Sequence, residues 1–212
     1  MASMQQFQLS LHLRDLDIHR GGQVVAENVS FDVLPGEALV LRGPNGSGKT
    51  SILRAIAGFS SSRKGNIEFQ QGEAIADPSE VRAHAIHWIG GGDGLADRLT
   101  VNQCVAFWAG LYGARPSPNL LVQVGLASGS DQFAGELSLG QRRRLAMTRL
   151  FLARRALWLL DEPLGGLDHS AKALMLKLIA AHRQEGGLVL MASHEEGLPQ
   201  AKTLHLSNEV QI

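Results

Sequence analysis

The most constraining feature of the sequence is a glycine-rich turn between an apolar run and a helical stretch. The run GEALVLRG, residues 36–43, is nearly continuous in apolar residues, as expected of a strand buried on both faces of a sheet. The turn that follows has glycines at 43, 46 and 48, which let successive backbone N–H groups point inward at an anion. A helix that begins after the turn adds the positive end of its dipole. The sequence therefore predicts a strand, a phosphate-binding loop and a helix, in that order.

The spacing within this turn matches the P-loop of nucleotide-binding proteins. Four residues separate Gly43 from Gly48, and Lys49 and Thr50 follow directly. We expect Lys49 to reach the β- and γ-phosphates of ATP, and the Thr50 hydroxyl to ligate Mg²⁺. The predicted nucleotide-binding residues of the loop are Gly43, Pro44, Asn45, Gly46, Ser47, Gly48, Lys49, Thr50 and Ser51. A turn that binds nothing is the alternative, and lysine and threonine at these offsets argue against it.

A second apolar run supplies the carboxylates that nucleotide hydrolysis requires. Residues 156–160, ALWLL, are followed by Asp161 and Glu162. Asp161 suits a Mg²⁺ ligand, and Glu162 suits the base that polarises the attacking water. Because strands often end in solvated carboxylates, this pair indicates catalysis only in combination with the P-loop upstream.

The order of apolar runs and helical stretches predicts an α/β fold. Strands are expected at 9–13, 29–34, 36–43, 65–70, 84–89, 156–161, 188–193 and 203–207. Helices are expected at 49–58, 101–112, 118–126, 139–153 and 170–184. Buried strands separated by helices favour a parallel core sheet, to which the early antiparallel strands and the later helices are additions. We expect one domain over residues 1–212, with a helical subdomain at about 95–150.

Composition narrows the partners and the setting. With 20 basic and 20 acidic residues, the chain gives no electrostatic reason to expect nucleic acid, and the local run Arg142 to Arg144 reads as a solvated helix face. The one cysteine, Cys104, forms no internal disulfide, which favours a cytoplasmic setting over a secreted one. The N-terminus lacks a signal-peptide pattern, and the apolar runs fall short of the roughly 20 residues of a membrane span.

The segment LSLGQ, residues 137–141, resembles the LSGGQ signature of ABC-type ATPases and lies upstream of Asp161 and Glu162, as in that family. Ser138 and Gln141 also have the spacing of a helix capping box, at a helix start that can hold an anion. The resemblance implies a P-loop NTPase fold with a RecA-like core sheet, an N-terminal antiparallel β subdomain and an inserted α-helical subdomain. It further implies a homodimer joined by ATP, in which Ser138, Gly140 and Gln141 close over the γ-phosphate held by the partner's P-loop.

Four further positions are read through this resemblance. LGGLD resembles the D-loop and ends at Asp168, and SHEE places His194 as the H-loop histidine that contacts the γ-phosphate. Where many members stack an aromatic ring on adenine, this chain has Arg20, whose guanidinium either stacks on the base or stays solvated. The Q-loop glutamine position falls on Gly91, so we expect a water at the metal there, with Asp93 as the alternative.

Longer phrases, among them GPNGSGKTSILRAIAG and LTVNQCVAFWAGLYG, resemble the ATP-binding subunits of the haem exporters of cytochrome c maturation. This resemblance implies a peripheral ATPase at the cytoplasmic face of the bacterial inner membrane, bound to integral membrane subunits. Its hydrolysis of ATP would power haem export or release of a haem-loaded chaperone. We expect no direct haem binding, because CxxCH is absent and the histidines are scattered.

Three other functions stay open at this point. The nucleotide site would be the same in the ATPase of another transporter, for a lipid, a drug or an ion. A soluble ABC ATPase that acts on DNA or ribosomes usually has a long coiled-coil insertion or two ATP domains, and the sequence has neither. A degenerate subunit that binds ATP without hydrolysing it is the third, and Glu162 and His194 argue against it.

Overall fold

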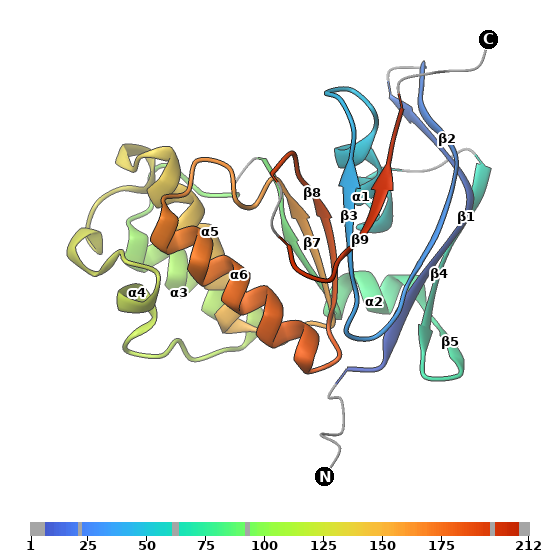
Figure 1. Ribbon diagram of the computed structural model, residues 1–212. Coiled ribbons are helices and arrows are strands. Elements are labelled where there is room, and N and C mark those ends of the chain that lie inside the picture. Colours follow the sequence, from blue (N-terminus) through green and yellow to red (C-terminus); the bar gives the residue numbers. More distant parts are fainter. Residues whose placement is uncertain (1–6, 21–22, 61–63, 92–93, 196–197, 208–212) are drawn as a thin grey trace. The chain divides into compact units, whose positions relative to one another are not determined.

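The computed structural model describes residues 7–20, 23–60, 64–91, 94–195 and 198–207 (Figure 1). The chain divides into two compact units. The first, here called the sheet unit, comprises Met1–Trp88, Arg155–Glu162 and Ile179–Ile212. The second, the helical unit, comprises Ile89–Arg154 and Pro163–Leu178.

An antiparallel sheet forms one layer of the sheet unit. Its strand order is β2-β1-β4-β5, with β1 at Leu9–Arg20, β2 at Gln23–Val33, β4 at Lys64–Gln71 and β5 at Ala74–Ala76. On β1 the alternate residues Leu9, Leu11 and Leu13 are at most 1% exposed and belong to the hydrophobic core, as expected of a sheet with one face on the core. The alternation in the sequence therefore correctly predicted this layer, although β1 and β2 are both longer than expected.

A second sheet contains the strands whose ends lead into the candidate functional site. Its order is β6-β7-β8-β3-β9, with β3 at Ala38–Arg42, β6 at Ile86–Ile89, β7 at Leu157–Asp161, β8 at Leu188–Ala192 and β9 at Lys202–His205. The pairs β7–β8, β8–β3 and β3–β9 are parallel. Every residue of β7 and β8 is buried, as their continuous apolar runs predict.

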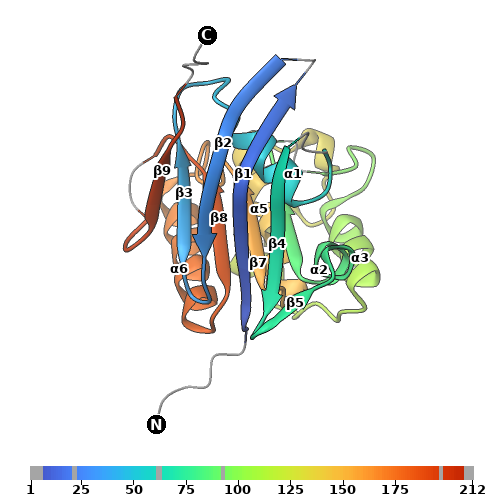
Figure 2. The same cartoon turned by 90° about the vertical axis from the view of Figure 1, so that its right-hand side faces the viewer.

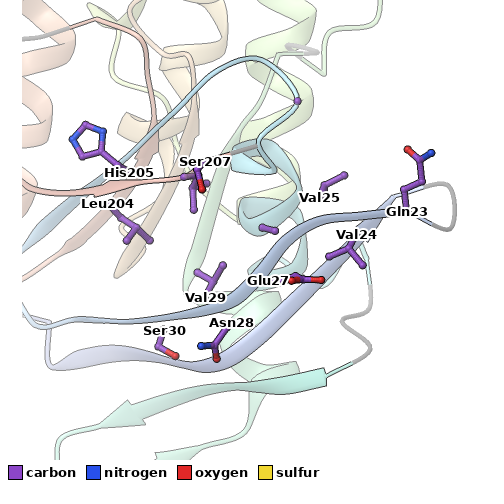
Figure 3. A pocket seen from close by; sticks show the side chains of 13 residues that line it. Gln23, Val24, Val25, Glu27, Asn28, Val29, Ser30, Leu204, His205 and Ser207 are labelled. Atoms are coloured by element: carbon purple, nitrogen blue, oxygen red, sulfur yellow. The ribbon is translucent and has the colours of Figure 1, made fainter. Parts of the chain in front are cut away.

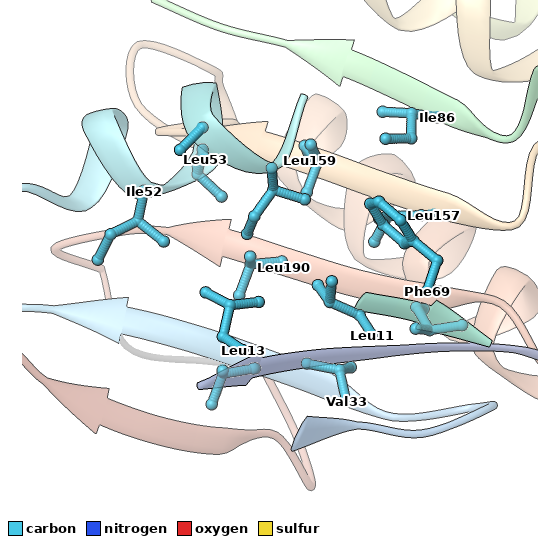
Figure 4. Close-up of a cluster of buried hydrophobic side chains, with 14 of the residues drawn as sticks. Leu11, Leu13, Val33, Ile52, Leu53, Phe69, Ile86, Leu157, Leu159 and Leu190 are labelled. Carbon is cyan, nitrogen blue, oxygen red and sulfur yellow. The ribbon is translucent and has the colours of Figure 1, made fainter. Parts of the chain in front are cut away.

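The core of the sheet unit lies between the two sheets (Figures 2 and 4). Leu11 and Leu13 of β1 point toward Leu159 of β7 and Leu190 of β8, while Ile52 of α1 (Lys49–Ile56) closes the same layer (Figure 4). Each of these five side chains is fully buried, so the core holds β3, β7 and α1 in fixed register. Those three elements carry the P-loop and the two carboxylates.

The helical unit contains α3 (Val101–Tyr112), α4 (Leu120–Gln123), α5 (Leu139–Leu152) and the first part of α6 (His169–Gln184), which continues into the sheet unit. The start of α3 is fixed by a capping box, in which the Gln103 N–H donates to Thr100 Oγ1 at 3.3 Å and the Thr100 N–H donates to Gln103 Oε1 at 2.8 Å. In the part of the chain that the structure describes, no helix combines the length and hydrophobicity of a membrane span.

The predicted α/β class is confirmed, and two of the expected elements have different bounds. The strand expected at 84–89 is present but begins only at Ile86, because a helix, α2 (Pro78–His84), precedes it. Asp77 caps that helix by accepting the Ser79 N–H at 2.7 Å, and Pro78 suits its first position.

The helix expected at 118–126 is much shorter than expected, because only the four residues of α4 are helical there. Gly125 adopts a left-handed φ of 72°, which suits the end of a helix. The C-terminal limit of the segment is therefore set by this glycine.

Candidate nucleotide-binding site

The P-loop connects the end of β3 to the start of α1, as predicted. Its glycines adopt left-handed φ values of 144° at Gly43, 89° at Gly46 and 90° at Gly48, which side-chain-bearing residues disfavour. Lys49 is 8% exposed, and its ammonium donates to the carbonyls of Gly43 at 2.8 Å and Pro44 at 2.9 Å. The lysine therefore curls back over the loop that is predicted to hold the phosphates.

The two predicted Mg²⁺ ligands lie side by side. Thr50 is in the first turn of α1, and Asp161 is the last residue of β7. The Thr50 hydroxyl lies 3.0 Å from each carboxylate oxygen of Asp161, to which it donates. A hydroxyl and a carboxylate are the oxygen ligands that Mg²⁺ prefers, so the donor set fits this metal. The pair is assembled by the packing of α1 on the sheet.

Glu162, His194 and Asn45 converge beside this pair. Glu162 follows β7 with a left-handed φ of 50°, and its N–H donates to Ala192 O at 2.9 Å. The carboxylate of Glu162 accepts the His194 N–H at 3.4 Å, and the His194 ring nitrogen Nε2 lies 3.6 Å from Glu162 Oε1. The same Nε2 makes a 3.0 Å hydrogen bond with Asn45 Oδ1 of the P-loop. One imidazole thus links the proposed base to the phosphate-binding loop.

This convergence follows from the sheet topology. In the parallel sheet Asp161 pairs with Ala192, and Leu41 of β3 pairs with the same residue from the other side. The carboxyl ends of β3, β7 and β8 therefore meet at one edge, which is where ligands bind in open α/β sheets.

The predicted signature residues form a helix start within the helical unit. Ser138 caps α5 by accepting the Gln141 N–H at 3.3 Å, while the Ser138 N–H donates to Gln141 Oε1 at 2.8 Å. This capping box was expected from the spacing. Gly140 follows Ser138 in the first turn of α5, and a Cβ added to Gly140 would come within 3.0 Å of Gly166 O.

Asp168 lies at the start of α6, also within the helical unit. Its carboxylate accepts the Ala171 N–H and the Ser170 hydroxyl, each at 2.9 Å, and binds the Arg144 guanidinium. These hydrogen bonds, that of Ala171 foremost, lower the pKa of Asp168 from 3.8 to about 2. Asp168 is therefore an ionised and fixed carboxylate.

Three predicted positions, Arg20, Gly91 and Asp93, have no described contact with the site. The side chain of Arg20 and the residue Asp93 lie outside the described part of the structure. Gly91 is exposed, and a Cβ built on it meets no atom within 4 Å. A side chain at position 91 would therefore find open space.

The sequence did not predict a groove along β2. An open hollow of about 540 Å³ is lined by β2 from Gln23 to Ser30, by Gly46 of the P-loop and by residues 204–207 (Figure 3). Val24, Val25 and Ala26 give its end near the P-loop an apolar wall. No motif marks this groove, because it forms where the edge of one sheet faces the edge of the other. The apolar run VVA on β2 is the only signal in the sequence.

Comparison with known proteins agrees with this geometry. The sequence profile of the ABC transporter family matches residues 26–165. The chain therefore belongs to the ABC transporter family, and its fold and nucleotide site define it as an ABC ATPase.

Its relatives identify a branch within this family. A protein of Cereibacter sphaeroides named cytochrome c biogenesis ATP-binding export protein CcmA is 41% identical over 200 residues, which cover 94% of this chain and 90% of the relative. Proteins of the same name from Ruegeria pomeroyi and Maricaulis maris are 40% and 38% identical, covering 88% and 93% of this chain and 85% and 92% of their own. The resemblance to this branch is thus confirmed.

Solved structures confirm the fold. An ATP-binding subunit of an ABC transporter superposes with a TM-score of 0.81 at 27% identity, over 93% of this chain and 86% of its own. A Pyrococcus furiosus ABC transporter ATP-binding protein superposes with a TM-score of 0.77 at 25% identity, over 93% and 97%. A dimeric ATP-binding cassette in a post-hydrolysis state, bound to ADP and Pi, shares the fold with a TM-score of 0.76 at 19% identity over 93% and 94%.

Proposed function

We propose that this ABC ATPase is the ATP-hydrolysing subunit of a transporter complex for cytochrome c biogenesis, and that it powers haem export or release of a haem-loaded chaperone. The observation that carries the ATPase activity is the cluster of Thr50, Asp161, Glu162 and His194 around the P-loop. The cytochrome c role is supported by the 41% identity to a protein named for cytochrome c biogenesis.

Each residue of the cluster has one task in this proposal. Lys49 exchanges its two carbonyl partners for β- and γ-phosphate oxygens of ATP, and the P-loop N–H groups bind the remaining phosphate charge. Thr50 and Asp161 hold Mg²⁺, which offsets the charge of the phosphates. Glu162 orients the attacking water and accepts its proton, and His194 bridges Glu162 to the γ-phosphate.

The site needs a second copy of the chain to be complete. Ser138, Gly140 and Gln141 offer the N-terminus of a capped helix, which attracts an anion. In the proposed head-to-tail homodimer, this helix start closes over the γ-phosphate held by the partner's P-loop. ATP therefore stabilises the dimer, and its hydrolysis releases it.

The adenosine part of ATP is proposed to lie near the β2 groove. Its apolar wall from Val24 to Ala26 adjoins Gly46 of the P-loop (Figure 3). Val25 and its neighbours supply apolar contact where many family members supply an aromatic ring. Arg20, at the end of β1, is the proposed stacking residue beside them.

The membrane subunits are proposed to dock on α3 of the helical unit, from the cytoplasmic face of the inner membrane. Phe107 and Leu111, one helical turn apart, are 60% and 67% exposed. Beside them a small apolar hollow of about 100 Å³ is lined by Leu99, Cys104 and Trp108 among others. An exposed apolar surface with a hollow favours contact with another protein. No haem ligation and no nucleic acid contact is part of the proposal.

Two experiments test the proposed function. Substitution Glu162→Gln should keep ATP binding but abolish turnover, so that an ATP-bound dimer accumulates in size-exclusion chromatography. An unchanged hydrolysis rate would remove Glu162 from the role of base. Deletion of the chromosomal copy should abolish haem-stained c-type cytochromes, whereas normal cytochromes would leave only a generic transporter ATPase.

A further inference from the structure

The run Arg142, Arg143 and Arg144 is not a solvated face of α5. Arg142 donates to Asp97 Oδ1 at 2.7 Å and to Ala134 O at 2.8 Å. The side chain of Arg144 is only 18% exposed and reaches Asp168, while Arg143 donates to Gly165 O. All of these partners lie within the helical unit. The two later arginines thus join the signature helix to the D-loop.

Close backbone packing reinforces the same junction. Gly140 of the signature lies against Gly166 O of the D-loop, where a Cβ would be only 3.0 Å from the oxygen. A Cβ added at Gly166 would lie 3.2 Å from Leu139 Cδ2, and a Cβ at Gly165 would be 2.8 Å from the Arg143 guanidinium. A side chain at position 140 would press on the Gly166 carbonyl, whereas one at position 165 would meet the movable end of Arg143. We call this set of contacts the signature–D-loop junction.

Within this junction, Asp168 is held by a divided set of donors. One carboxylate oxygen, Oδ1, accepts the Ala171 N–H and the Ser170 hydroxyl, both from α6 itself. The other oxygen, Oδ2, accepts from Arg144 of α5. The Asp168 side chain is nevertheless 61% exposed, so it remains accessible to a partner chain. Arg144 therefore connects the Asp168 carboxylate to the signature helix.

We propose that Arg144 is a positioning residue, which couples the orientation of Asp168 and the D-loop to the signature helix. When the signature closes over a partner's nucleotide, the D-loop then moves with it, so that hydrolysis at one site responds to occupancy at the other. This inference rests on the proposed dimeric ATPase. Arg144 is well suited to the task, because its planar fork contacts Asp168, Ser170 and Val124 O together.

The experiment is a double-mutant cycle on the full chain with Arg144→Ala, Asp168→Asn and the double variant. We expect kcat to fall by about 10- to 100-fold in Arg144→Ala, since misplacing a positioned group by about 1 Å has effects of this size. ATP affinity measured by calorimetry should stay within about twofold, because the P-loop is untouched. The double variant should have the same kcat as the less active of the two single variants, because Arg144 acts through Asp168.

Two further variants separate positioning from folding. Arg144→Lys keeps the charge but loses the planar fork, so it should restore only part of kcat. Arg115→Ala removes an exposed arginine of the same unit and should leave kcat and the circular dichroism spectrum unchanged. The inference would be overturned if Arg144→Ala kept the parent kcat, or if the losses of kcat in the two single variants multiplied in the double variant. Either result would leave the proposed function standing. A parent protein without ATP hydrolysis would overturn the proposed function together with the inference.

Discussion

The Thr50 hydroxyl donates to both carboxylate oxygens of Asp161, at 3.0 Å each, although 111 residues separate the two in the chain. The fold therefore places the two predicted ligands of Mg²⁺ next to each other. A preorganised pair of this kind lowers the entropy that must be lost when the metal is captured.

Removal of this hydroxyl tests the pair. Thr50→Val keeps the shape of the side chain and removes one oxygen ligand. We expect Mg²⁺-dependent hydrolysis to fall by roughly 100-fold or more, the scale of a lost transition-state contact, while ATP still binds in EDTA. The measurement is steady-state ATPase activity over a Mg²⁺ titration, with Thr148→Val as a control outside the site. Full activity in Thr50→Val would exclude the hydroxyl as a ligand.

Restoring a glutamine at position 91 tests the altered Q-loop. A Cβ at Gly91 meets nothing within 4 Å, and its φ is outside the left-handed region, so Gly91→Gln should fold normally. We expect the variant to need less Mg²⁺ for half-maximal turnover, because the amide oxygen replaces a water at the metal. Gly110→Gln serves as the matched control, because a Cβ there also meets nothing within 4 Å and its φ is outside the left-handed region. An identical Mg²⁺ dependence in Gly91→Gln and parent would contradict this prediction.

The depressed pKa of Asp168 predicts a specific dependence on pH. Hydrogen bonds from Ala171, Ser170 and Arg144 lower the pKa of Asp168 from 3.8 to about 2. Above pH 3.8 the ionised carboxylate therefore stabilises the folded state. This contribution is lost as pH falls from 3.8 through about 2. We expect the stability difference between parent and Asp168→Asn, measured by urea unfolding, to be constant down to about pH 5 and to shrink below it. A difference that already shrinks between about pH 7 and 5 would contradict the assignment.

The exposed residues of α3 predict a defect in docking without a defect in hydrolysis. The double variant Phe107→Ser, Leu111→Ser removes the two large exposed apolar side chains of α3. The buried face of the helix, including Trp108, stays intact. We expect the purified variant to hydrolyse ATP at the parent rate but fail to restore c-type cytochromes in the deletion strain. Val122→Ser, which changes an exposed residue on α4, is the control. Full complementation by the double variant would place the docking surface elsewhere.

The sequence was sufficient for the core sheet and for most of the site, because these depend on local patterns. Glycine spacing indicated the P-loop, and continuous apolar runs indicated β7 and β8. The signals for α2 are also present, since Asp77 before Pro78 is a typical helix start, but the expected elements include no helix between the strands at 65–70 and 84–89.

Contacts between distant segments could not be predicted in the same way. The hydrogen bond of His194 with Asn45 joins residues 149 apart, and the contact of Arg144 with Asp168 joins two separate helix starts. Nothing in a run of three arginines distinguishes a solvated helix face from three half-buried side chains that bind neighbouring segments. Such differences depend on tertiary distances, which periodicity does not report.

The strand that leads into the P-loop has its neighbours far along the chain. Leu39 of β3 pairs with Leu190 of β8 on one side and with Lys202 of β9 on the other. The antiparallel partners β1, β2 and β4 are close in sequence, whereas β3 finds its partners only across long stretches of chain. The sheet that carries the phosphate loop therefore depends on long-range pairing, which is the slower kind of contact to form during folding.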